Sequence, residues 1–328
     1  ELAWQERKAM SFTFSPLHSG SAQLSRPDGT TGGAYRDTSC YAGGITLAGA
    51  MAISGAAANP NMGYHSSPAL SFLLTICDVR LGAWLGNPAR DGYRRKHPGG
   101  ALEVSGTCML NEALGQVDAS STWINLSDGG HFENLGLYEM VRRGCKLIVA
   151  SDASADREGS FDDLGRAFRL IRTDLGIEFE ELVENGLPEK PTKAPDPDKR
   201  GSYRRWRLFR IQYPTGSDAP GRVPWPDNDT SVEAGYLLYF KTVLLGNEPQ
   251  DVRYYASTAP DFPHESTGDQ FFSESQFESY RKLGEVTLPE FSRQRAATPP
   301  ADSPGALLAT FLTALNSTTP AQPEPLPS

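Results

Sequence analysis

The sequence has few of the residues on which several classes of function depend. Its four cysteines are scattered without a Cys-x-x-Cys pair, which favours neither a disulfide framework nor a zinc site. Lysine and arginine number 31 against 40 aspartates and glutamates, giving a formal charge of −9. Because phosphate contacts depend on clustered positive charge, we expect no nucleic-acid partner.

Long apolar runs that would cross a membrane are also missing. The uncharged stretch Gly43–Ala58 is rich in alanine and glycine and is shorter than the roughly 18 to 20 residues that span a bilayer. Pro68–Leu85 is apolar but is interrupted by Asp78 and Arg80. We predict that both stretches are helices buried within the protein.

The stretch that begins at Trp123 organises the middle of the chain. An apolar run ends at Asp128-Gly129-Gly130, an amphipathic segment covers Phe132–Arg143, and a second apolar run covers Lys146–Ala150. This order predicts strand, tight turn, helix, strand. Two glycines allow a sharp turn after a strand, and a carboxylate just before them lies at the carboxyl end of a parallel strand, where open α/β sheets place their chemistry. Asp128 is therefore the leading candidate for a functional residue.

Further elements follow from apolar spacing. Phe161–Leu175 has helical spacing, with acidic residues in its first turn and arginines near its end, and Phe271–Leu283 is a second predicted helix, capped by Ser273 or Ser275. Tyr203–Tyr213 alternates as a half-exposed strand. The basic segment Asn87–Gly100 is either a contact for lipid phosphates or a solvated loop.

Three blocks of the sequence lie in order over roughly residues 35–284. They are Ala52–Ala57 leading into Pro60–Pro68, Asp128–Glu139, and Pro260–Thr267 leading into Gln276–Arg281. Together they resemble the patatin-like phospholipases, which are related to the cytosolic phospholipases, and in particular the large microbial members of that family.

This resemblance implies a fold, a reaction and a site. The fold is an α/β hydrolase with a mostly parallel central sheet flanked by helices. The reaction is hydrolysis of acyl esters of phospholipids or other lipids by a Ser-Asp dyad, without metal or organic cofactor, at a protein in peripheral contact with a membrane surface. Asp128 would be the general base, Gly129 and Gly130 would shape its turn, and Asn134 would bond that turn and lie near the substrate.

The sequence does not contain the motif that normally carries the nucleophile in the resembled family. No Gly-x-Ser-x-Gly elbow occurs in the 328 residues. The alternative nucleophile is Ser54, in Ala52-Ile53-Ser54-Gly55-Ala56, if the residues before it form a strand. The chain begins at Glu1 without an initiator methionine, so we expect a fragment whose serine lies upstream and which is inactive alone.

The domain prediction combines composition and resemblance. With 32 glycines and 25 prolines, we expect a loop-rich segment over residues 1–40, the carboxyl-terminal part of the patatin-like domain over residues 41–291, and a disordered Pro/Ser/Thr-rich tail over residues 292–328. We expect a cytoplasmic protein, with membrane association through the preceding part as an alternative.

Other functions of the Asp128 turn remain as alternatives. Asp128 could be a turn aspartate that bonds its own backbone, or it could join His131 and Glu133 at a metal, although no regular spacing places the three on one face. A Ser-His-Asp triad that uses His131 is disfavoured, because Asp128 and His131 leave the same turn and a triad needs the histidine between the aspartate and the serine. We therefore expect His131 to cap or orient the following helix. The alternative to an enzyme is a degenerate patatin fold that binds lipid or another protein.

Overall fold

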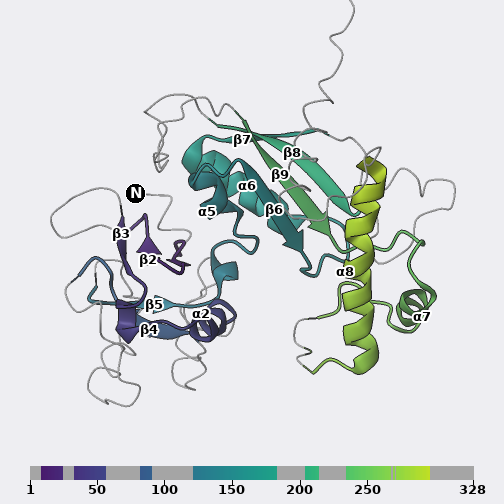
Figure 1. The fold of residues 1–328 in the computed structure, drawn as a ribbon, viewed down its shortest axis with the longest axis horizontal. Coiled ribbons are helices and arrows are strands. Elements are labelled where there is room, and N and C mark those ends of the chain that lie inside the picture. Colours follow the sequence, from purple (N-terminus) through teal and green to yellow (C-terminus); the bar gives the residue numbers. More distant parts are fainter. Residues whose placement is uncertain are drawn as a thin grey trace, which may run out of the picture. The chain divides into compact units, whose positions relative to one another are not determined.

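The structure is a computed structural model that describes residues 9–24, 33–56, 82–90, 121–182, 204–213, 234–266, 269 and 271–295. The chain divides into two compact units. Unit 1 comprises residues 1–150, 161–180 and 210–237, and unit 2 comprises residues 151–160, 181–209 and 238–328. Helices and strands alternate along the chain, so the fold class is mixed α/β (Figure 1).

The elements, in chain order, are β1 (Thr13–Phe14), β2 (His18–Ser21), β3 (Ala34–Asp37), η1 (Tyr41–Gly43), α2 (Leu47–Ser54), β4 (Ala83–Gly86), β5 (Trp123–Leu126), η3 (Gly129–His131), α5 (Leu137–Arg142), β6 (Leu147–Asp152), α6 (Asp162–Leu175), β7 (Glu178–Glu181), β8 (Trp206–Gln212), β9 (Ala234–Lys241), α7 (Gln250–Thr258) and α8 (Glu274–Arg295).

The strands form sheets with the orders β1-β2-β3, β4-β5 and β6-β9-β8-β7. The first two sheets are antiparallel. In the third sheet, Tyr236 N donates to Lys146 O at 2.8 Å and Thr242 N donates to Asp152 O at 3.4 Å. Both strands advance together between these two bonds, so β6 and β9 are parallel.

The direction of β5 differs from the prediction. The strand before Asp128 was expected to be parallel and to share a sheet with the strand that ends near Asp152. Instead β5 pairs antiparallel with β4, and β6 lies in another sheet. The last residues of the apolar run 68–85 were expected to be helical, but they form strand β4 with Gly86, and β5 pairs with this strand. The prediction of a mostly parallel sheet is thus wrong for β5 and right for the pair β6 and β9.

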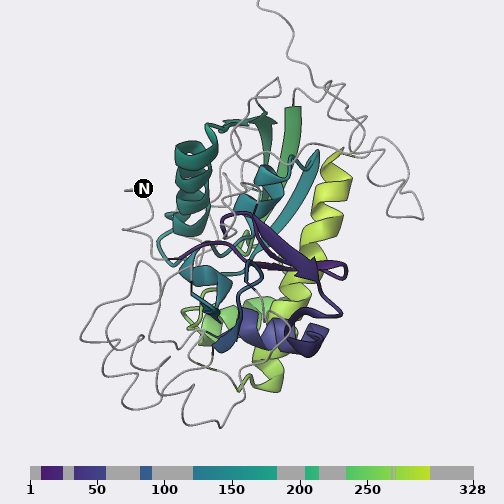
Figure 2. The same ribbon diagram turned by 90° about the vertical axis from the view of Figure 1, so that its left-hand side faces the viewer.

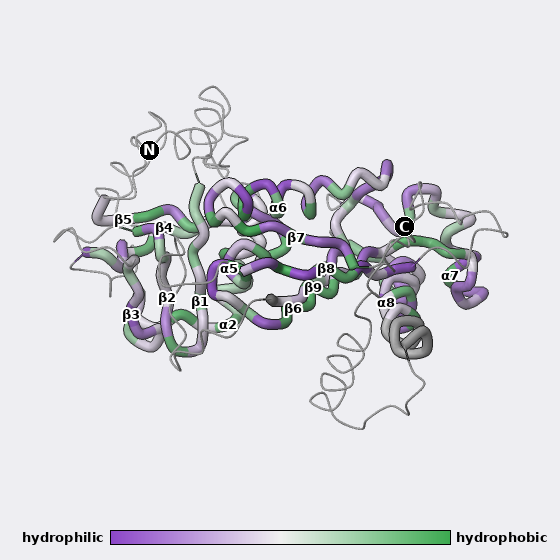
Figure 3. The backbone as a smooth tube through the Cα atoms, turned by 90° about the horizontal axis from the view of Figure 1, so that it is seen from above, coloured by the Kyte–Doolittle hydropathy of each residue, from purple (hydrophilic) through white to green (hydrophobic). Residues whose placement is uncertain are grey.

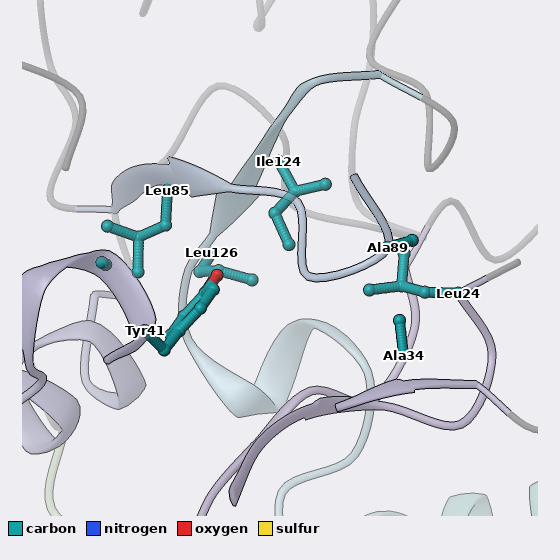
Figure 4. Close-up of a cluster of buried hydrophobic side chains, with 8 residues drawn as sticks. Leu24, Ala34, Tyr41, Leu85, Ala89, Ile124 and Leu126 are labelled. Atoms are coloured by element: carbon teal, nitrogen blue, oxygen red, sulfur yellow. The ribbon is translucent and has the colours of Figure 1, made fainter. Parts of the chain in front are cut away.

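The core of unit 1 lies beneath β4 and β5. Ile124 and Leu126 lie two residues apart on β5, so both face this core, and Leu85 reaches it from β4 (Figure 4). The ring of Tyr41 enters from η1 and is fully buried, with Phe12 at a centroid distance of 5.9 Å. This cluster fixes β5, and therefore the place where the chain leaves it at Ser127 and Asp128.

Helix α6 forms where the spacing predicts it. Leu164, Ala167, Leu170, Ile171 and Leu175 are buried and lie on one face, while the acidic first turn complements the helix dipole. The alternation of apolar and polar residues is visible along α6 in Figure 3. Gly176 ends the helix in the left-handed conformation, with φ of 64°.

Unit 2 contains α7 and the long helix α8, which runs as one unbroken rod (Figures 1 and 2). Ser273 and Gln276 form a reciprocal cap at its start: Gln276 N donates to Ser273 Oγ at 3.2 Å, and Ser273 N donates to Gln276 Oε1 at 3.3 Å. The two helices share a core of Leu244, Val252, Phe262 and Leu283. The prediction of a serine-capped helix is confirmed.

Helix α2 is not buried, contrary to the prediction for Gly43–Ala58. None of its residues is buried, and Leu47 and Met51 are 78% and 65% exposed. The helix itself is confirmed over its eight residues and is capped by Thr46, whose Oγ1 accepts from Gly49 N at 3.0 Å. Composition without charge therefore predicted the helix and not its burial.

The other predictions divide by where they fall. Residues 1–40, expected to be loop-rich, contain the antiparallel sheet β1-β2-β3. Helix α8 continues to Arg295, a few residues into the predicted tail, and the rest of that tail lies outside the described residues. Most of the segments 68–85 and 87–100 also lies outside them.

Candidate functional site

Asp128 lies two residues beyond β5 and caps the short helix η3. Its Oδ1 accepts from Gly130 N at 2.7 Å, and its own N donates to Ala56 O at 3.4 Å. In the part of the chain that the structure describes, Gly130 N is the only hydrogen-bond donor to this carboxylate. The side chain is half-buried. Among the described residues, the other carboxylate oxygen of Asp128, Oδ2, therefore has no hydrogen-bond partner.

The two glycines after Asp128 have different roles. A Cβ built on Gly130 would lie 2.1 Å from Asn134 Oδ1, whereas one built on Gly129 meets nothing within 4 Å. Asn134 is exposed and donates from Nδ2 to Asp163 Oδ1 at 2.6 Å. Its amide thus lies against the Gly130 backbone and ties the turn to α6. Absence of a side chain is required at Gly130 and not at Gly129.

The turn also contains a serine and histidine pair that the sequence did not reveal. Ser127 Oγ and His131 Nδ1 lie 2.9 Å apart across the turn, and His131 O accepts from Arg166 Nη2 at 3.4 Å. Their spacing of four residues was the only available signal, and it is common in chains without such a contact. The pair closes the base of the turn, in keeping with the expected orienting role of His131.

Glu133 is committed to helix α5. Its Oε1 accepts from Leu135 N at 2.5 Å and its Oε2 accepts from Tyr138 N at 3.2 Å. Burial raises the pKa of this carboxyl, against the lowering effect of the backbone N–H donors. With both oxygens turned toward the helix, Glu133 does not converge with Asp128 and His131. Among the described residues there is no group of three histidine, cysteine, aspartate or glutamate side chains suited to a metal.

Ser54 is the last residue of α2 and is exposed. The bond from Asp128 N to Ala56 O brings the end of this helix beside the Asp128 turn. However, a nucleophile elbow places serine between a strand and the start of a helix, where N–H groups can hold an oxyanion. At the end of α2 carbonyl groups are available instead. The residues before Ser54 form helix α2, so the strand that the alternative nucleophile would need is not present there.

A second aspartate, Asp152, ends β6 in unit 2 and is fully engaged. Lys241 Nζ donates to its Oδ1 at 2.9 Å, and Tyr239 OH donates to its Oδ2 at 2.5 Å. Ser154 adds its N at 2.9 Å and its Oγ at 2.7 Å to Oδ1. The side chains of Asp152 and Lys241 are each 1% exposed. Although burial alone would raise the pKa of Asp152, these hydroxyl and ammonium donors hold it below its usual range.

The sequence did not reveal these partners of Asp152. Tyr239 and Lys241 lie two residues apart on β9, so they share a face of that strand. A lysine on the face of an otherwise apolar strand is a signal of a buried charge pair. Its partner could not be named without the fold, because 89 residues separate Lys241 from Asp152.

Comparisons with known proteins found no match among family models, curated proteins or solved structures. Within the described ranges, no helix has the length and hydropathy that a membrane crossing requires.

Proposed function

We propose that the protein is a lipid acyl hydrolase in which Asp128 is the general base of a Ser-Asp dyad. The observation that carries the proposal is the contrast between the two aspartates that follow strands. Asp152 is buried, paired with Lys241 and bonded at both oxygens. Asp128 is half-buried and accepts a single hydrogen bond, from Gly130, within the described residues. Of these two aspartates, Asp128 is the one that has a carboxylate oxygen without a hydrogen bond from the described residues, and this oxygen could accept a proton.

The geometry of the turn suits that role. The bond from Gly130 N holds Oδ1 and so orients the carboxylate while Oδ2 stays open. In the proposed reaction a serine hydroxyl attacks the ester carbonyl and gives its proton to Oδ2. The tetrahedral intermediate then collapses to an acyl-serine, and the proton passes to the leaving alkoxide. Asp128 next takes a proton from a water molecule whose oxygen attacks the acyl-serine carbonyl. The bond between the acyl carbon and the serine Oγ then breaks, the proton returns from Asp128 to Oγ, and the fatty acid leaves.

The proposal assigns this chain the base and not the nucleophile. Ser54 stands at the carbonyl end of α2 and lacks the N–H groups that an oxyanion needs. Ser127 Oγ lies 2.9 Å from His131 Nδ1, but Ser127 directly precedes Asp128 in the chain and leaves the same turn, so the proposal gives it no catalytic role. The substrate class, acyl esters of phospholipids or other lipids, rests on the resemblance of the three sequence blocks, as does peripheral contact with a membrane surface. No metal or organic cofactor enters the reaction.

The test uses the 328-residue chain and the full product of its gene. Each is treated with a fluorophosphonate probe and assayed on phosphatidylcholine vesicles and on p-nitrophenyl butyrate. We expect the gene product to be labelled and active, and Asp128→Asn to lower kcat by roughly 100-fold to 10,000-fold, the usual contribution of a general base. Asp162→Asn is the matched control, because it makes the same substitution at an exposed aspartate of unit 1, in the first turn of α6, and it should keep full activity.

Two results would contradict the proposal. One is full activity of Asp128→Asn in a folded protein. The other is probe labelling at Ser54 in the isolated chain that disappears in Ser54→Ala, which would make Ser54 the nucleophile. Absence of both labelling and hydrolysis in the gene product would instead favour the non-catalytic alternative, a module that binds lipid or another protein.

A further inference from the structure

Two loops of unit 2 meet around a buried histidine. The first loop, residues 152–160, follows β6, and the second, residues 259–265, follows α7; we call them the β6 loop and the α7 loop. His264 in the α7 loop is 1% exposed. Asp156 N in the β6 loop donates to its Nδ1 at 3.0 Å. Since a backbone N–H can only donate, this bond requires a neutral ring with Nδ1 unprotonated and the proton on Nε2.

We propose that protonation of His264 opens the contact between the β6 loop and the α7 loop; we call this contact the latch. Besides the bond to Asp156, the latch contains the ion pair of Arg157 Nη2 with Asp261 Oδ2 at 2.8 Å. Arg157 Nε also donates to His264 O at 3.5 Å. The ion pair is about half exposed at both side chains, so it is screened and weak, and the buried imidazole bond is the principal tie.

The hydrogen bond that His264 Nδ1 makes depends on whether the ring is protonated. When His264 is neutral, Nδ1 accepts from Asp156 N. When it is protonated, Nδ1–H can only donate, and the acceptor within reach is Ser154 O at 3.3 Å. That carbonyl already accepts from Lys241 Nζ at 3.0 Å. Protonation therefore releases the Asp156 N–H and places a second cation beside Lys241.

The surroundings of the ring favour the neutral form in the closed latch. Burial is the largest effect and lowers the pKa of His264 from its ordinary value of 6.5. Lys241 on β9 acts in the same direction, whereas the Ser154 carbonyl and the carboxylates of Asp156 and Asp152 oppose it. On the α7 loop itself the nearby charged groups are Asp261 and Glu265, with Arg157 reaching it from the β6 loop. Nε2 is buried and has no hydrogen-bond partner among the residues that the structure describes, so the hydrogen bonds of the ring are at Nδ1.

The direction of the pH effect follows from these contacts. In the closed latch His264 resists protonation, whereas in an opened latch, in water, it protonates near pH 6.5. The open form therefore binds the additional proton, and its population rises about tenfold for each pH unit below that value until the closed form is itself protonated. Above pH 7 the latch stays closed.

The experiment is hydrogen exchange of the full chain, followed by mass spectrometry, with rates corrected for intrinsic exchange at each pH. We expect protection of the peptide 153–160 to fall about tenfold between pH 7.5 and pH 5.5. In His264→Asn the fall should disappear, because the asparagine Oδ1 can accept from Asp156 N and does not titrate. His18→Asn, at an exposed histidine of unit 1, should behave as wild type.

The outcomes are decisive in either direction. The same tenfold fall in His264→Asn, or no fall in wild type, would overturn the proposal. If His264→Asn does not fold, the wild-type protein still provides a test through the ¹⁵N chemical shifts of its histidines. The latch requires a neutral His264 with the proton on Nε2 at pH 7.5 and a titration midpoint lowered from the ordinary value of 6.5; a proton on Nδ1 would refute it.

Discussion

Replacing Lys241 with methionine tests the buried pair most directly. Lys241 Nζ makes three hydrogen bonds, to Asp152 Oδ1 at 2.9 Å, Ser154 O at 3.0 Å and Ser154 Oγ at 3.2 Å. Methionine has a similar length and keeps an apolar stem at this position of β9, but it leaves the Asp152 carboxylate buried without a counter-charge. Breaking such a pair costs about 3 to 5 kcal/mol of the free energy of unfolding.

Urea denaturation followed by circular dichroism measures this loss. With a slope of roughly 2 kcal/mol per molar, the midpoint should fall by about 2 M. Arg281→Met is the matched control, because Arg281 and Glu278 form an ion pair with 49% of each side chain exposed, and we expect no change in midpoint there. The double variant Asp152→Asn/Lys241→Met should regain part of the loss, because it removes the stranded charge.

The pH dependence supplies a second check on the same pair. The pKa of Asp152 is lowered in the folded state, so its contribution to stability is present above the ordinary value of 3.8 and is lost as the pH falls through the folded pKa. Without Lys241 the carboxyl protonates at higher pH. The stability deficit of Lys241→Met should therefore shrink on acidification from neutral pH. A deficit below about 1 kcal/mol at pH 7, or one that does not change with pH, would refute this account.

Two further predictions concern the turn in unit 1. Gly130→Ala should lower the free energy of unfolding by roughly 1 to 2 kcal/mol, because the new methyl group displaces Asn134 from Asp163. Gly129→Ala should have no effect, because a Cβ there meets nothing within 4 Å. Thermal melts compare the two variants, and an equal loss of stability in both would contradict the geometry. Glu133→Gln should cost about 1 to 2 kcal/mol at pH 4.5 by losing one N–H acceptor. Because the pKa of Glu133 is raised in the folded state, its contribution to stability is present below the ordinary value of 4.5 and is lost as the pH rises through the folded pKa. In thermal melts, the difference in stability between wild type and Glu133→Gln should therefore decrease toward neutral pH. An increase in that difference would contradict this account.

Local structure was predictable wherever neighbouring residues determine it. The spacing of Phe161–Leu175 predicts α6, and Ser273 with Gln276 three residues later predicts the start of α8. The alternation in Tyr203–Tyr213 predicts β8, which spans Trp206–Gln212. The order of strand, turn and helix around Asp128 was also correct. These signals act within one or two turns of chain, so no knowledge of the fold is needed to use them.

Pairing and burial were not predictable from the same patterns. An apolar run of four residues such as Ala83–Gly86 has the composition of either a helix end or a strand, and only its partner β5 decides between them. Helix α2 is uncharged yet exposed, because burial depends on what other parts of the chain cover it. At the candidate site the open oxygen of Asp128 could not be foreseen, since it depends on which donors reach the turn.

The parallel pairing of β6 with β9 has a consequence for the order of folding. The hydrogen-bonded residues Lys146 and Tyr236, like Asp152 and Thr242, are ninety positions apart. Closing a chain segment of that length costs about 4 kcal/mol of entropy beyond a constant, so this contact is a late and slow step. On the ribosome, at roughly 5 to 20 residues per second, β6 must wait several seconds for its partner. During that interval its apolar residues Ile148 and Ala150 are open to other chains, so an unpaired β6 can associate with the wrong strand during synthesis.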